Sequence, residues 1–153
     1  MRLFFTLIFI FFFNSSFAEE VFYDLKGNKI SYKQILSASP NTVILLWTSW
    51  CPYCRLTILN INKDIDEECI YYDGVDFFYI NLGEDGKRIK KFIEKNKIKK
   101  CIEKNILLDR KNILTKKFSA FGIPTFIFLK NGIPIHKSFF INKELLKGVF
   151  ENE

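Results

Sequence analysis

The sequence predicts a single α/β domain in which a central mixed β-sheet is flanked by helices and carries an extra N-terminal β-hairpin. Residues 42–47 form an uncharged run rich in β-branched and aromatic side chains, as expected of a strand buried on both faces of a sheet. A second apolar run, residues 75–80, follows a helical crossover, and such a crossover makes two strands parallel. The dipeptide Asn131-Gly132 separates two further apolar runs and indicates an antiparallel hairpin. Parallel and antiparallel pairs in one chain predict the mixed sheet.

The first 18 residues have the features of a secretory signal peptide, and residues 19–153 then form the folded domain. Arg2 is followed by an apolar run over residues 3–13, too short to span a bilayer, which needs about 20 apolar residues. Ser16 and Ala18 supply small residues at the two positions that a signal peptidase reads. An uncleaved N-terminal anchor is the alternative. Both interpretations place the domain in the periplasm or another exported compartment.

The exported part has the size of one domain and a moderate positive charge. Residues 19–153 comprise 135 residues with 22 Lys and Arg against 17 Asp and Glu, a net charge of +5. A chain of this length can bury a sufficient core without relying on disulfides. The lysines are spread over many segments, and export excludes most nucleic acid as a partner. We therefore expect a monomer that binds no nucleic acid.

The exported chain opens with a hairpin and a short helix. Residues 21–23 and 29–31 are two strand patterns separated by a glycine-containing turn. Ser31 and Gln34 then match a capping box, which predicts a short helix that continues to Leu36.

The segment Trp-Thr-Ser-Trp-Cys-Pro-Tyr-Cys, residues 47–54, carries the reactive chemistry. Apolar residues recur at helical spacing over residues 55–66, so Pro52 falls in the first turn of a helix, where its missing N–H costs nothing. Cys51 then lies at the helix N-terminus, where free backbone N–H groups and the helix dipole favour a thiolate. Cys54 lies one turn later on the same side. A thiolate at Cys51 can attack a partner's disulfide, and Cys54 can then resolve the mixed disulfide.

Helices and strands continue to the end of the chain. A helix over residues 85–96 places apolar side chains on one side and lysines on the other, which indicates a solvated face more than a docking patch for an acidic partner. The remaining predicted elements are a strand at 106–108, a helix at 113–118, a strand beginning at Pro124, a strand at 133–140 and a helix at 143–150 capped by Asn142.

The strand, the Trp-Cys-x-x-Cys helix start and the Gly-Ile-Pro-Thr segment that ends at Thr125 resemble the thioredoxin superfamily over nearly the whole exported chain. The signal peptide, the opening hairpin, the crossover helix and the Leu-Asp pair at 108–109 resemble more narrowly the exported TlpA/ResA-like thiol-disulfide oxidoreductases. The resemblance implies a thioredoxin-like fold, a redox-active pair without a cofactor, and a cis bond before the proline. The substrate-binding surface that it implies consists of Trp50, Pro52, Tyr53, Ile123 and Pro124.

Three positions depart from the superfamily pattern. Leu45 replaces a buried Asp of thioredoxins, Thr57 replaces a Glu of ResA-like proteins, and Leu59 replaces a helix proline. A buried acid normally handles the proton of the second cysteine, so water or a main-chain group would have to serve Cys54. The Pro-Tyr pair between the cysteines resembles a glutaredoxin active site, and we interpret it as a tuning of the redox potential.

Two more cysteines and the single histidine lie outside this segment. Cys69 and Cys101 are expected at the end of the sheet opposite the dithiol, where a structural disulfide between them is slightly favoured over two free thiols. A zinc site is a weaker alternative because only Cys51 and Cys54 form a close pair, and no metal is expected. His136 lies on the last hairpin, away from the dithiol, and is interpreted as non-catalytic.

The sequence supports two classes of function. The first is a thiol-disulfide oxidoreductase that exchanges disulfides with cysteine-containing exported proteins and with a membrane or periplasmic thiol donor or acceptor. The resemblance adds cytochrome c maturation as a role. The alternative is a binding module in which the cysteine pair is redox-inert or structural. Intact Cys51 and Cys54 at a helix start favour the enzyme, with reduction, oxidation and isomerisation all open to it.

Overall fold

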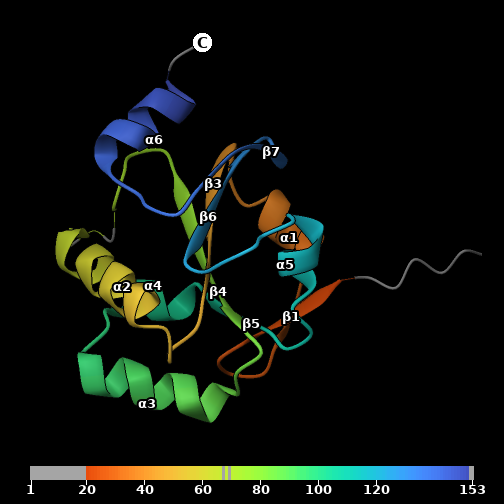
Figure 1. Cartoon of the computed structure of the whole chain (residues 1–153), viewed down its shortest axis with the longest axis vertical. Helices are drawn as coiled ribbons and strands as arrows, with labels where there is room; N and C mark the ends of the chain where they lie inside the picture. Colours follow the sequence, from red (N-terminus) through yellow and green to blue (C-terminus); the bar gives the residue numbers. More distant parts are fainter. Residues whose placement is uncertain (1–19, 67, 69, 152–153) are drawn as a thin grey trace, which may run out of the picture.

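A seven-stranded mixed β-sheet runs through the middle of the protein, and helices cover both of its faces (Figure 1). The computed structural model describes residues 20–66, 68 and 70–151. The strands are β1 (Val21–Asp24), β2 (Lys29–Ser31), β3 (Asn41–Trp47), β4 (Asp76–Leu82), β5 (Ile106–Asp109), β6 (Thr125–Lys130) and β7 (Ile133–Ser138). The helices are α1 (Tyr32–Leu36), α2 (Pro52–Asp64), α3 (Gly86–Asn96), α4 (Lys100–Lys104), α5 (Ile113–Lys117) and α6 (Lys143–Phe150). The order across the sheet is β2-β1-β5-β4-β3-β6-β7.

Strand β3 lies near the centre of the sheet because its side chains are apolar on both faces. It pairs in parallel with β4 and antiparallel with β6, and six of its seven residues are buried. Strand β6 in turn forms an antiparallel hairpin with β7 through Asn131 and Gly132, both of which have positive φ angles. The predicted mixed sheet, with one parallel crossover and one terminal hairpin, is confirmed. The segment with Cys51 and Cys54 therefore comes directly after a strand that is buried on both faces.

The N-terminal hairpin belongs to the main sheet rather than standing ahead of it. Strand β1 pairs antiparallel with β2, as predicted, but its other edge pairs antiparallel with β5, where Tyr23 lies opposite Leu108. The predicted N-terminal hairpin is confirmed, and its pairing with β5 makes it part of the main sheet. Two strands are thereby added to the side of the sheet away from β6.

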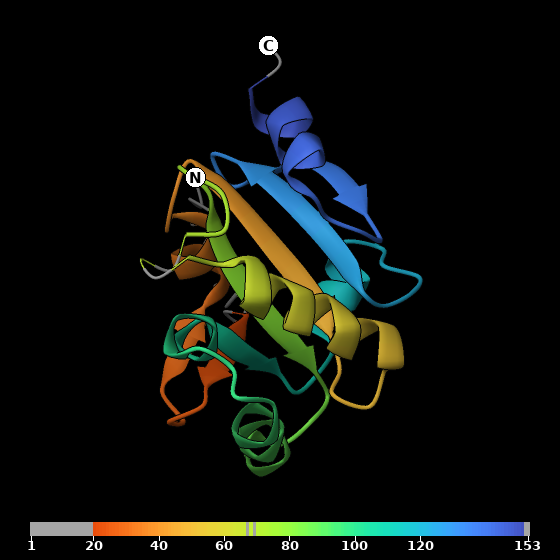
Figure 2. The same ribbon diagram turned by 90° about the vertical axis from the view of Figure 1, so that its left-hand side faces the viewer.

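Two apolar cores lie on the two faces of the sheet. On one face, α2, α3, α4 and α6 pack against a set of strand residues that includes Val43, Leu45 and Trp47. On the other face, α1 and α5 cover a set that includes Ile44 and Leu46. Figure 2 shows α2 lying across the first of these faces. Successive residues of β3 alternate between the two cores, which is why this strand reads as continuously apolar.

Most predicted helices and strands are confirmed within a few residues of their expected ends. The capping box of α1 is present, since the Ser31 hydroxyl accepts the Gln34 N–H and the Gln34 side chain accepts the Ser31 N–H. Strand β7 ends at Ser138, earlier than predicted, and Pro124 precedes β6 instead of opening it. Helix α4 was not predicted at all, because its five residues form little more than one turn and no side chain caps its start.

The predicted signal peptide, residues 1–18, lies outside the described residues. Within the part of the chain that the structure describes, every helix is too short or too polar to cross a membrane.

Candidate active site

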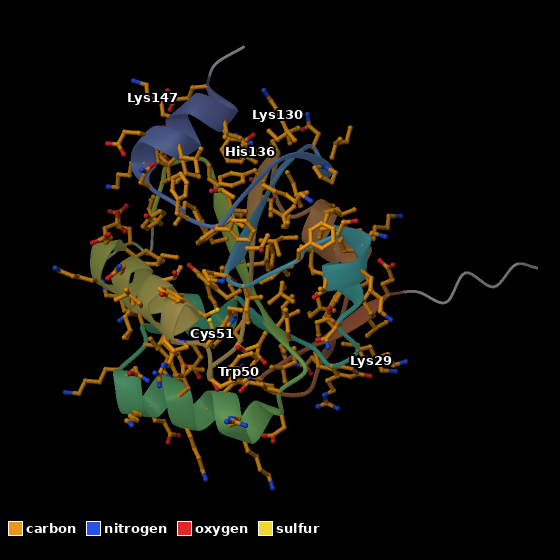
Figure 3. The ribbon with its side chains drawn as sticks, viewed as in Figure 1. Lys29, Trp50, Cys51, Lys130, His136 and Lys147 are labelled. Carbon is orange, nitrogen blue, oxygen red and sulfur yellow. The ribbon has the colours of Figure 1, made fainter. Side chains whose placement is uncertain are left out.

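Cys51 and Cys54 lie where β3 gives way to α2, as the sequence predicts. Cys51 is the N-cap residue of α2, and the exposed Pro52 follows it in the first turn. The Cys51 sulfur accepts a hydrogen bond from the backbone N–H of Cys54, with an N···S distance of 3.3 Å. Only 6% of Cys51 is exposed. The helix start thus offers this sulfur the N–H donor and the positive dipole end that an anion prefers. Figure 3 shows Cys51 at the end of α2, with Trp50 beside it toward α3.

Cys54 is fully buried and carries its proton at neutral pH. It belongs to the same apolar core as Leu45 and Ile58. Burial first, and the hydrogen bond and charge of the neighbouring Cys51 sulfur next, raise the pKa of Cys54 to about 12. Cys54 is therefore a neutral thiol at neutral pH. Any attack by its sulfur on a disulfide requires the loss of this proton.

The Ile123-Pro124 segment forms a second wall of the site. Ile123 is 72 residues away from Cys51 in the chain, yet the Cys51 thiol contacts its carbonyl oxygen at an S···O distance of 3.9 Å. The bond between Ile123 and Pro124 is cis, as the family resemblance implies. Pro124 is buried and Ile123 is half-buried. The Thr125 hydroxyl donates a 2.6 Å hydrogen bond to the Gly122 carbonyl and fixes the turn that leads into β6.

Large aromatic side chains lie on the surface beside the two cysteines. Trp50 and Tyr53, which flank Cys51 in sequence, are both well exposed. Phe121 is 96% exposed, and the Phe139 ring lies against the glycine that precedes Ile123. Phe121 and Phe139 could not be predicted from the sequence, because an apolar residue in a loop has no periodic pattern to mark it. An exposed group of aromatic residues is typical of a surface that contacts other proteins.

A buried carboxylate, which no sequence pattern indicates, holds the segment that leads into Cys51. Glu84 follows β4 and is 7% exposed. One of its oxygens accepts the Ser49 backbone N–H at 2.6 Å and the Asn81 side-chain amide at 2.7 Å. The other oxygen accepts the Ser49 hydroxyl at 2.6 Å and lies 3.2 Å from Nε of Arg88. Glu84 therefore ties β4 and α3 to the residue two positions before Cys51.

At the two positions where the superfamily has an acidic residue, this chain has none. Leu45 is buried in the core that contains Cys54, and Thr57 is half-buried on α2. His136 is exposed on β7 with its ring edge-on to Phe128, in the upper part of the molecule in Figure 3, whereas Cys51 lies in its lower half. His136 is therefore too remote to exchange a proton with Cys54.

The predicted disulfide between Cys69 and Cys101 involves a residue outside the described part of the chain, since Cys69 is not described. Cys51, Cys54 and Cys101 are free thiols, so the structure corresponds to the reduced dithiol. Cys101 is buried on α4 in the core beneath α2. Among the described residues, no group of three His, Cys, Asp or Glu side chains is placed to hold a metal ion. The pairing of Cys69 with Cys101 stays a prediction.

Replacing both residues, Cys69→Ser with Cys101→Ser, is expected to lower the melting temperature of the oxidised protein and to leave its disulfide exchange intact. The bond would close a loop of about 30 residues, which the chain-entropy model values at roughly 3 to 4 kcal/mol. Thermal unfolding of the oxidised wild type and of the double variant measures the difference. Equal melting temperatures, or two alkylatable thiols at these positions in the oxidised wild type, would exclude the bond.

The chain resembles known proteins in both sequence and structure. The model of the family described as "AhpC/TSA family" matches residues 14–146, most of the chain. A curated relative, Sporulation thiol-disulfide oxidoreductase A of Bacillus subtilis (strain 168), is 27% identical over 122 residues, which cover 74% of this chain. That match spans 66% of the relative, slightly less than two thirds of its length.

Solved structures share the fold over most of their length. StoA from Bacillus subtilis matches with a TM-score of 0.63 and 25% identity, over 84% of this chain and 92% of StoA. A secreted Mycobacterium tuberculosis disulfide oxidoreductase homologous to E. coli DsbE matches with a TM-score of 0.63 and 16% identity, over 84% and 91% of the two chains. The exposed lipoprotein thioredoxin of Streptococcus pneumoniae strain TIGR4 has a TM-score of 0.65 and 17% identity, over 88% and 100%. The predicted thioredoxin-like fold is thus confirmed, and the chain belongs to the AhpC/TSA family.

Proposed function

We propose that the protein is an exported thiol-disulfide oxidoreductase that acts on other proteins through Cys51 and Cys54. The geometry of the cysteine pair carries this proposal. The Cys51 sulfur accepts an N–H at a helix start, and a second thiol lies one turn behind it. A protein that only binds partners has no need for two free thiols in this arrangement. The family match and the similarity to StoA support the same activity.

In the reducing direction, the Cys51 thiolate attacks one sulfur of a partner's disulfide. A Cys51–partner disulfide forms, and the other partner sulfur leaves as a thiolate that takes up a proton. Cys54 then loses its proton and attacks the Cys51 sulfur, which releases the second partner thiol and leaves a Cys51–Cys54 disulfide. Two electrons have passed from the dithiol to the partner. The same steps in reverse oxidise a partner dithiol.

The proposed partners are exported proteins that contain cysteines, together with a membrane or periplasmic thiol donor or acceptor that restores the dithiol. The predicted signal peptide supports export, as do the relatives described as secreted or exposed. We assign the partner-binding surface to Trp50, Pro52, Tyr53, Ile123 and Pro124, extended by Phe121 and Phe139. The resemblance to TlpA/ResA-like proteins supports the cysteine pairs of c-type cytochromes as one substrate class.

An insulin-reduction assay with dithiothreitol tests the proposed activity. The protein is expected to shorten the time before reduced insulin precipitates, because Cys51 attacks the insulin disulfides and dithiothreitol then regenerates the dithiol. The binding-module alternative predicts the same precipitation time with and without the protein. Circular dichroism of the same sample verifies that the protein is folded.

A further inference from the structure

A groove between α2 and α3 opens beside the active site. It has a volume of about 410 Å³, and Ser49 and Pro52, which bracket the segment leading into Cys51, form one end of its lining. In Figure 1 α3 lies below α2, and in Figure 3 Trp50 lies between Cys51 and α3. At the other end, the Asn62 side chain accepts the Lys99 N–H at 2.7 Å and joins α2 to the segment after α3. A partner bound at Cys51 can therefore extend into this groove.

The groove combines an apolar surface with positive charge. Leu56 is 57% exposed although it lies in a helix, and Leu59 and Phe92 line the groove with it. Three cations also line the groove, namely Arg55, Lys91 and Lys95. Among the described residues that line it there is no Asp or Glu. A partner segment that fits this surface has carboxylate side chains next to an apolar side chain.

The three cations have no ion-pair partner among the described residues. No ion pair within the described part of the chain involves Arg55, Lys91 or Lys95, and the buried acid behind Ser49 is already engaged by its own hydrogen bonds. Lys91 and Lys95 are four residues apart on one side of α3, a spacing at which like charges disfavour a helix. Cations that have no ion-pair partner among the described residues favour an external anion.

We propose that this groove binds an acidic segment of the substrate protein, next to the cysteine that reacts with Cys51. This inference rests on the proposed oxidoreductase function and names the substrate class for it. The carboxylates of the segment pair with Arg55, Lys91 and Lys95, and an apolar side chain between them packs on Leu56. The lysines of α3 then face two different sites. Lys91 and Lys95 serve binding, whereas Lys90, on the same helix, lines a separate cavity with Asp24 and Glu103.

Peptides with a single cysteine test the proposal. The cysteine is joined by a disulfide to 5-thio-2-nitrobenzoate, whose release is coloured, and is flanked on both sides by Glu-Leu-Glu, Gln-Leu-Gln or Lys-Leu-Lys. At low ionic strength the reduced protein is expected to react about tenfold faster with the Glu peptide than with the Gln peptide, as two or three exposed ion pairs allow. The advantage is expected to shrink to about twofold in roughly 0.5 M salt.

Two single charge reversals on α3 distinguish binding in the groove from attraction by the net positive charge of the protein. Lys91→Glu is expected to reduce the preference for the Glu peptide over the Gln peptide to about twofold or less. Lys90→Glu, which changes the net charge equally, is expected to keep the full preference. An equal loss in both variants, or no preference for the Glu peptide in the wild type, would overturn the proposal. Failure to react with any peptide would instead contradict the oxidoreductase function itself.

Discussion

The Cys54→Ser variant is expected to accumulate covalent complexes with cysteine-containing proteins. Cys51 keeps its position at the helix start and still attacks a partner's disulfide. The resolving thiol is missing, so the mixed disulfide persists. Non-reducing electrophoresis of the variant, purified from cells under acid quench, should show bands that disappear with dithiothreitol.

The matched variant Cys51→Ser is expected to form no such complexes. Cys54 is fully buried, and burial, the largest cause of its raised pKa, persists in this variant, so Cys54 stays a neutral thiol out of reach of a partner and cannot take over the attack. Insulin reduction by Cys51→Ser should fall at least about 10³-fold, as expected when an attacking nucleophile is removed. Complexes trapped by Cys51→Ser and not by Cys54→Ser would reverse the assignment of the two roles.

The Glu84→Ala variant is expected to lose about 3 to 5 kcal/mol of folding free energy, because donors that Glu84 now satisfies lose a charged acceptor. These donors are the Ser49 N–H, the Ser49 hydroxyl and the Asn81 amide, at 2.6, 2.6 and 2.7 Å. The segment before Cys51 then loosens, and we expect insulin reduction to slow about tenfold in the fraction that remains folded. Urea unfolding and initial rates at a fixed folded concentration measure the two effects.

Arg88→Gln provides the control for the Glu84 variant. The Arg88 side chain is 60% exposed, so removing its ion pair with Glu84 should cost less than about 1 kcal/mol. Glu84→Gln should lie between the two, since an amide keeps one accepting oxygen and presents its NH₂ group to a donor. If Glu84→Ala is as stable as Arg88→Gln, the hydrogen bonds to Ser49 do not hold the active-site segment.

The central part of the fold could be predicted because its signals are local. The uncharged run of β3, the proline at the start of α2 and the Asn-Gly turn before β7 each specify their structure from neighbouring residues alone. The positions of Cys51 and Cys54 follow from the same signals. The contact between Cys51 and Ile123 required the family resemblance, because nothing in either segment indicates the other.

The features that were missed depend on contacts between distant segments. Glu84 stands after a strand among other polar residues, and only its contact with Ser49, 35 residues earlier, shows that it is buried. The pairing of β1 with β5 joins segments about 85 residues apart. The alternating sequence pattern of a strand does not indicate which other strand it pairs with. The groove between α2 and α3 likewise exists only after both helices have packed on the sheet. Leu56 looks like a core residue in the sequence, yet it is mostly exposed.

The two outer strands of the sheet have features that hinder the addition of a strand from a second chain. Strand β2 has three residues and begins with the exposed Lys29, and β7 contains Pro134 and meets β6 across an irregularity at Phe128 and Leu129. Short length, charge, proline and bulges all hinder edge-to-edge aggregation. Exposed aromatic rings such as Phe121, which we assign to the proposed partner-binding surface, also favour self-association. Because the sheet edges hinder strand pairing, contacts between copies of the protein involve side chains and do not extend into intermolecular β-sheets.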